Sequence, residues 1–129
     1  MTMPSEREKL AEIISQSKSV ADALAAAAAC CSTVNEHLLT MLDLGRLCDS
    51  VLEFGSGFST VAWAASEARV TTVDCEPEPW MARLASLPGV SLVAIQDGSL
   101  TFPPQPSDLL FIDTCHRYDY LLAELRRHG

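Results

Sequence analysis

The chain has 129 residues, which is enough for one domain with a modest core and too few for two. Hydrophobic residues make up 48% and charged residues 20%, and seventeen acidic against nine basic residues give a formal charge of −8. That charge repels a phosphate backbone and no cluster of lysine and arginine overrides it, so the composition argues against a nucleic-acid partner.

The most apolar run, 20–31, is too short for a membrane span, which needs about twenty residues, and it contains Asp22. No basic segment followed by a leucine-rich core opens the chain, so we expect no signal peptide. The five cysteines are odd in number and form no CxxC pair. They are expected to be free thiols rather than zinc ligands, which fits a reducing compartment. We therefore expect a cytoplasmic protein without a membrane partner.

The first fifty residues carry helical patterns. An acidic first turn after Ser5 and apolar residues at helical spacing predict one broken helix or two helices up to about Cys31. A further helix is expected within 32–49, with Asn35 as its N-cap and an end at Gly45 or near Asp49.

From position 50 the pattern changes to short apolar runs, which we expect to be strands at 50–54, 69–74, 90–95 and 108–113. Helical patterns separate the first three runs, and another follows the fourth at 118–129. The prolines of 100–107 predict a loop. Continuously apolar strands that alternate with helices are typical of an α/β fold, a doubly wound parallel sheet.

A polar residue stands at or near the end of each predicted strand, where such sheets bind their ligands. Gly55 and Gly57 allow a tight turn after the first strand, and Ser59 and Thr60 follow at the start of a helix. Asp74 ends the second strand, a placement that suits a carboxylate accepting from two ribose hydroxyls. This pattern fits any cofactor that contains a nucleoside.

Glu53 narrows the choice of cofactor. A carboxylate close to a pyrophosphate costs Coulomb energy, whereas one beside an ammonium or a sulfonium gains it. S-adenosylmethionine carries both cations and no phosphate, so Glu53 favours that cofactor over a dinucleotide. Thr60 also stands where the dinucleotide fingerprint has its third glycine.

The ordered segments "VLEFGSGFST", "VTTVD", "AIQDGS" and "DLLFIDTCHRYDYLLAEL" resemble class I S-adenosylmethionine-dependent methyltransferases over about residues 35–129. The segment "FIDTCHRY" is similar to the subgroup with an I-D-x-x-H-x-Y motif, which includes cephalosporin-hydroxylase-like and sugar O-methyltransferase-like proteins. One departure is Ser59, where the family pattern has a third glycine. The resemblance implies a Rossmann-like sheet of order 3-2-1-4, with 1–34 as a helical extension and 35–129 as the cofactor-binding domain.

By the same resemblance, the protein transfers a methyl group to a hydroxyl of a small molecule or sugar. Asp74 would bind the ribose, Gln96 and Asp97 would flank the adenine, and Asp113 would lie beside the methyl-transfer centre. The expected cofactor-binding residues are Glu53, Gly55, Ser56, Gly57, Ser59, Thr60, Asp74, Gln96 and Asp97, and the expected catalytic residues are Asp113 and His116.

Each role has an alternative. His116 is a candidate general base, or Asp113 a ligand for a divalent metal, whereas His116 and Tyr118 could merely anchor a loop. Glu53 could be a strand-end acid paired with a helix N-terminus, Asp74 a helix cap, and Asp97 a turn residue. Trp63 and Trp80 are expected to be packing residues, and His37 a surface or core histidine.

The family sheet has seven strands and the sequence supplies four, so we expect a fragment or a truncated product with the fourth strand at an open edge. Self-association through that edge would follow. Two other functions stay open, namely a nicotinamide-dependent oxidoreductase and a non-catalytic assembly module.

Overall fold

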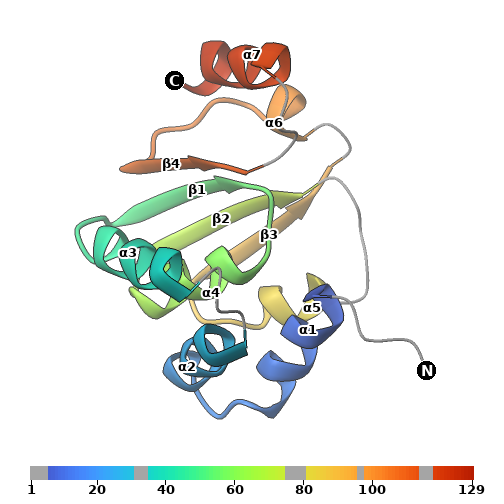
Figure 1. Ribbon diagram of the computed structural model, residues 1–129. Helices are drawn as coiled ribbons and strands as arrows, with labels where there is room; N and C mark the ends of the chain where they lie inside the picture. Colours follow the sequence, from blue (N-terminus) through green and yellow to red (C-terminus); the bar gives the residue numbers. More distant parts are fainter. Residues whose placement is uncertain (1–5, 31–34, 75–80, 96–97, 114–117) are drawn as a thin grey trace.

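The computed structural model describes residues 6–30, 35–74, 81–95, 98–113 and 118–129, which form seven helices and four strands (Figure 1). In chain order they are α1 (Glu6–Gln16), α2 (Val20–Cys30), α3 (Asn35–Gly45), β1 (Ser50–Phe54), α4 (Phe58–Ala65), β2 (Arg69–Asp74), α5 (Met81–Ala85), β3 (Val90–Ala94), α6 (Gly98–Thr101), β4 (Leu109–Ile112) and α7 (Tyr118–His128).

The four strands form one parallel sheet in the order β3-β2-β1-β4, as the sequence predicts. Glu53 of β1 pairs in register with Thr72 of β2 and with Phe111 of β4. Because all strands run the same way, their carboxyl ends lie along one edge of the sheet. The α/β fold class is therefore confirmed.

Helices α3 and α4 pack against one face of the sheet around β1 and β2, which we call the front face. Val51, Trp63 and Val70 are buried there, with Met41 and Phe111 packed against them. A second cluster joins Leu10 of α1 and Leu24 of α2 to Val61 of α4 and Leu84 of α5. The two N-terminal helices therefore share the core of the sheet domain.

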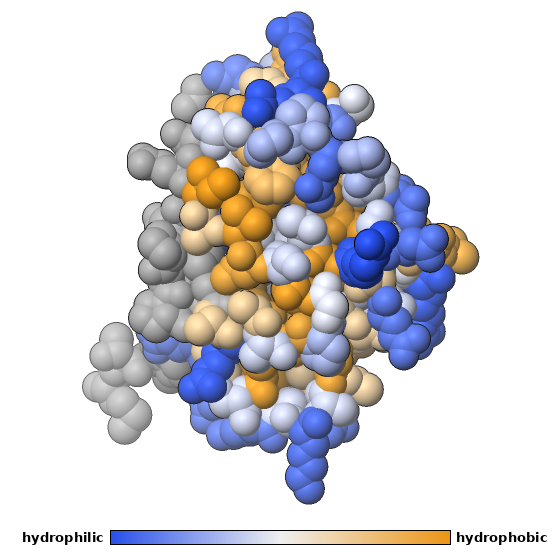
Figure 2. Space-filling model, turned by 180° about the vertical axis from the view of Figure 1, so that it is seen from behind, coloured by the Kyte–Doolittle hydropathy of each residue, from blue (hydrophilic) through white to orange (hydrophobic). Residues whose placement is uncertain are grey.

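The opposite face, the back face, is covered at its carboxyl half by α6 and α7. Leu52, Phe54 and Val73 form an apolar cluster there with Phe102, and the ring of His128 lies 4.5 Å from that of Phe54. Seen from behind, apolar residues gather in the middle of this face and hydrophilic residues surround them (Figure 2).

The helical pattern of the first thirty residues forms two helices, α1 and α2, because Ser19 caps the start of α2. The Ser19 hydroxyl accepts the backbone N–H of Asp22 at 3.1 Å, and this capping bond favours a new helix start over a continuous helix. The prediction of a loop from residue 100 is wrong at its start, because Leu100 and Thr101 belong to α6. None of the described helices is long and apolar enough to cross a membrane.

Candidate functional site

The turn after β1 requires glycine at its first position. Gly55 has a φ of 97°, a conformation that side chains other than glycine's rarely adopt, and its N–H donates to the Val73 carbonyl at 2.9 Å. This bond ties the turn to the end of β2, the strand that carries Asp74. The chain then enters α4 at Phe58, with Gly57 as the residue before the helix.

Glu53 is fully buried beneath this turn. Its carboxyl group accepts hydrogen bonds from the hydroxyls of Ser59 and Thr60, from Trp63 Nε1 at 3.0 Å and from Thr72 Oγ1 at 2.8 Å. Burial raises the pKa of Glu53 to about 7, although all four hydrogen bonds act to lower it. Three of these donors come from α4, so the geometry includes the pairing with a helix N-terminus that the sequence left open.

Asp74 is joined to Glu53 through the turn. The Ser56 hydroxyl lies 2.6 Å from Thr72 Oγ1, and the Ser56 N–H donates to Asp74 Oδ2 at 3.0 Å. Asp74 is 9% exposed, so most of its side chain is buried at the carboxyl end of β2. The two acids that the sequence pairs therefore lie at adjacent strand ends, within one hydrogen-bonded network.

A pocket of about 470 Å³ opens at the carboxyl ends of β1 and β4. The turn, the amino end of α3 and the end of β4 line it, through His37, Met41, Gly55, Ser56, Gly57, Phe58, Ser59, Phe111, Ile112 and Asp113. Five of the predicted site residues thus share one pocket, while Glu53, Thr60 and Asp74 are outside its lining. Glu53 has no exposed surface, so it reaches the pocket through the hydroxyl of Ser59 and, by way of Thr72, through that of Ser56.

Gly57 lines the pocket at a position where the fold does not require glycine. Its φ of 169° is an extended conformation open to any residue, and a Cβ atom placed there would meet nothing within 4 Å. Neither the backbone nor the packing therefore requires glycine at this position. The absent side chain keeps the pocket open beside the turn.

Three predicted site residues, Gln96, Asp97 and His116, lie outside the described residues. Among the described part of the chain, no group of three or more histidine, cysteine, aspartate or glutamate side chains could hold a metal ion. Asp113 is exposed at the end of β4 and lines the pocket, so it stays a candidate for the catalytic or metal-binding role.

Sequence reasoning missed Trp63 and Thr72 as partners of Glu53, and it missed the α3 side of the pocket. Thr72 precedes Asp74 by two residues, as Glu53 precedes Gly55, so aligning the two strand ends would have revealed the pair. His37 lines the pocket although its own helix gives no sign of it. The position of α3 beside the turn follows from its packing on α4, which no local pattern records.

No protein-family model matches the sequence, and no curated protein matches it.

Proposed function

We propose that the protein is an S-adenosylmethionine-dependent methyltransferase, or the cofactor-binding half of one, that acts on a hydroxyl of a small molecule or sugar. The parallel sheet of order 3-2-1-4 supports the proposal, as does a glycine turn at the carboxyl end of its central strand β1. The scattered cysteines of the sequence favour the cytoplasm as its compartment.

Gly57 is the observation that carries the proposal. A glycine that neither φ nor packing requires, in the wall of a pocket, is expected where a ligand approaches the backbone closely. The N–H groups of the first turn of α4 would bind the carboxylate of the methionine part. Asp74 would accept from the ribose hydroxyls.

The bound cofactor would supply an electrophilic methyl group on its sulfonium. The residues of this chain would hold that group in line with the acceptor oxygen, since methyl transfer depends chiefly on positioning. Asp113 lines the pocket on its β4 side, where it could bind the acceptor hydroxyl or take its proton. Glu53 would act through Ser59, because it orients this hydroxyl from beneath the turn.

A nicotinamide-dependent oxidoreductase is the second candidate. The main sequence argument against this candidate is the repulsion between Glu53 and the pyrophosphate of a dinucleotide. The carboxyl group is buried outside the pocket lining and has a pKa raised to about 7 by burial, so that repulsion is weaker than the sequence suggests. The glycine turn and Asp74 serve either cofactor.

Calorimetric titration separates the two candidates. We expect S-adenosylhomocysteine to bind the folded protein and NADH not to bind. Gly57→Ala should weaken S-adenosylhomocysteine binding because the methyl group of the alanine would enter the pocket. Asp74→Ala should weaken it about tenfold or more, which is the effect of losing a hydrogen bond to a charged group.

Asp43→Ala is the matched control. It removes an exposed aspartate of α3 that pairs with Arg46 at 3.8 Å, so the affinity should stay unchanged. Thermal unfolding of each variant verifies the fold. A folded wild type that binds NADH but not S-adenosylhomocysteine would reverse the ranking, and equal affinities in all variants would refute the site.

A further inference from the structure

A second hollow lies on the back face, at the amino ends of the strands. Its volume is about 650 Å³, within the range of about 300–1,000 Å³ that small-molecule sites have. The first residues of β1, β2 and β3 line it together with the segment that leads into β4. The lining consists of Ser50, Val51, Arg69, Val70, Thr71, Gly89, Val90, Ser91, Gln105, Pro106 and Ser107.

The back face changes from apolar to polar along its strands. Nearest the carboxyl ends, Phe54 lies in register with Val73, which pairs with Val93, and all three belong to the cluster around Phe102. Two residues before Val73 and Val93, the same face of β2 and β3 carries the polar pair Thr71 and Ser91. The polar half is the part that α6 and α7 leave open.

Ser50 and Arg69 form the next pair along this face, at the first position of β1 and β2. Both faces of a parallel sheet are usually apolar because helices cover them. Serine, threonine and arginine at successive rows of this sheet therefore depart from its expected composition.

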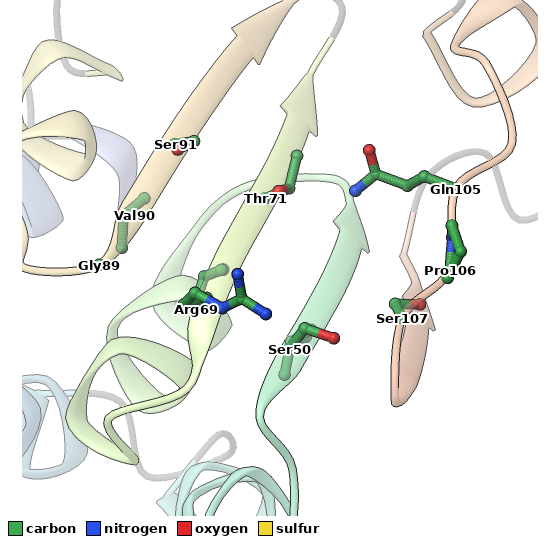
Figure 3. A pocket seen from close by; sticks show the side chains of 11 residues that line it. Ser50, Arg69, Thr71, Gly89, Val90, Ser91, Gln105, Pro106 and Ser107 are labelled. Atoms are coloured by element: carbon green, nitrogen blue, oxygen red, sulfur yellow. The ribbon is translucent and has the colours of Figure 1, made fainter.

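The two longest polar side chains of the hollow, those of Arg69 and Gln105, extend toward its middle. In Figure 3 the guanidinium group of Arg69 and the amide of Gln105 reach into the hollow from opposite sides. Among the described residues, no side-chain hydrogen bond or ion pair engages Arg69, Thr71, Ser91, Gln105 or Ser107. These side chains therefore line one hollow without forming hydrogen bonds to one another.

The charge of the hollow favours an anionic ligand. Arg69 is the one charged residue of its lining, in a chain whose formal charge is −8. A guanidinium group offers donors in a planar fork that matches the oxygens of a carboxylate or phosphate, and the neighbouring hydroxyls and amide can also donate.

We propose that this hollow binds a small molecule through an oxyanion, a phosphate ester or a carboxylate, held by Arg69 with Thr71, Ser91 and Gln105 beside it. The site lies at the opposite end of β1 and β2 from the glycine turn. It is independent of the methyltransferase proposal, and α/β sheets usually bind their ligands at the other end of the strands.

An NMR titration with inorganic phosphate and with malonate, at an ionic strength held constant with sodium chloride, tests the site and separates the two oxyanions. We expect saturable shifts of the amide signals of Arg69, Thr71 and Ser91 with at least one of them. Arg69→Gln should weaken that binding at least tenfold. Arg83→Gln, which removes an exposed arginine of α5, should leave it unchanged.

Shifts that never saturate and spread over the surface would overturn the proposal, because they indicate unspecific screening. An unchanged affinity in Arg69→Gln would do the same. If that variant does not fold, the double variant Thr71→Val with Ser91→Ala decides the question. Weaker binding by this variant supports the site, and binding equal to that of the wild type refutes it.

Discussion

Glu53 is a buried acid, and its hydrogen-bond partners among the described residues are all neutral. Serine, threonine and tryptophan donors stabilise its ionised form, yet no basic side chain in the described part of the chain forms an ion pair that would compensate the loss of hydration. The result is a carboxyl group with a pKa of about 7, which changes its charge within the physiological range. The side chain has no exposed surface.

This titration gives the first stability prediction. The pKa of Glu53 rises on folding from 4.5 to about 7, so the folded state binds more protons than the unfolded state between these values. The contribution of Glu53 to stability is therefore fully present below pH 4.5 and is lost as the pH rises to 7. The loss should reach about 3 kcal/mol at most.

Glu53→Gln isolates this contribution because glutamine stays neutral at every pH. Denaturant unfolding at pH 5 and pH 7.5 should show a smaller loss of stability for the variant than for the wild type. Glutamine keeps one carbonyl oxygen for Trp63 and Ser59 to donate to. The same pH dependence in both proteins would mean that the carboxyl group does not titrate in this range.

Helices α3 and α4 pack closely because Gly45 ends α3. A Cβ atom at Gly45 would collide with the hydroxyl of Ser66, and it would lie 2.7 Å from the Cβ of Ser66 and 3.2 Å from Cε3 of Trp63. The side chain of Trp63 is one of those that donate to Glu53. The spacing of the two helices therefore supports the floor of the candidate site.

Gly45→Ala should destabilise the protein by about 1–2 kcal/mol. Overpacking costs about 1–3 kcal/mol, and the better helix propensity of alanine returns at most about 1 kcal/mol. Thermal unfolding measures the difference. Gly57→Ala is the matched control, because it is the same substitution at a position where the added Cβ meets no neighbouring atom. It should lower the free energy of unfolding by less than about 1 kcal/mol. Equal effects would contradict the close contact.

The sequence predicts the elements that follow local patterns and misses those fixed by distant contacts. Apolar runs and the glycine turn suffice to place β1 to β4. Local patterns do not predict helix α6, because a distant residue stabilises its end. Arg127 of α7 donates to the carbonyls of Thr101 at 3.1 Å and Phe102 at 2.9 Å. The roles of Gln96, Asp97 and His116 stay predictions.

In the molecule as a whole, β4 lies at one edge of the sheet with its four residues half-buried. The self-association predicted from the sequence would use this edge, since unpaired backbone groups can bind another strand. Sedimentation velocity should show a mass that rises with protein concentration. The mass of a single chain at every concentration would contradict it and would weaken the case for an assembly module.

The pairing of β1 with β4 also has a consequence for synthesis on the ribosome. β1 pairs on one side with β2, the next strand along the chain, but its other neighbour begins only at Leu109. At about 5–20 residues per second, roughly one to four seconds separate the completion of Ala94 from that of Ile112. During that interval the nascent chain can build a three-stranded sheet whose future centre, β1, is still open to any passing strand.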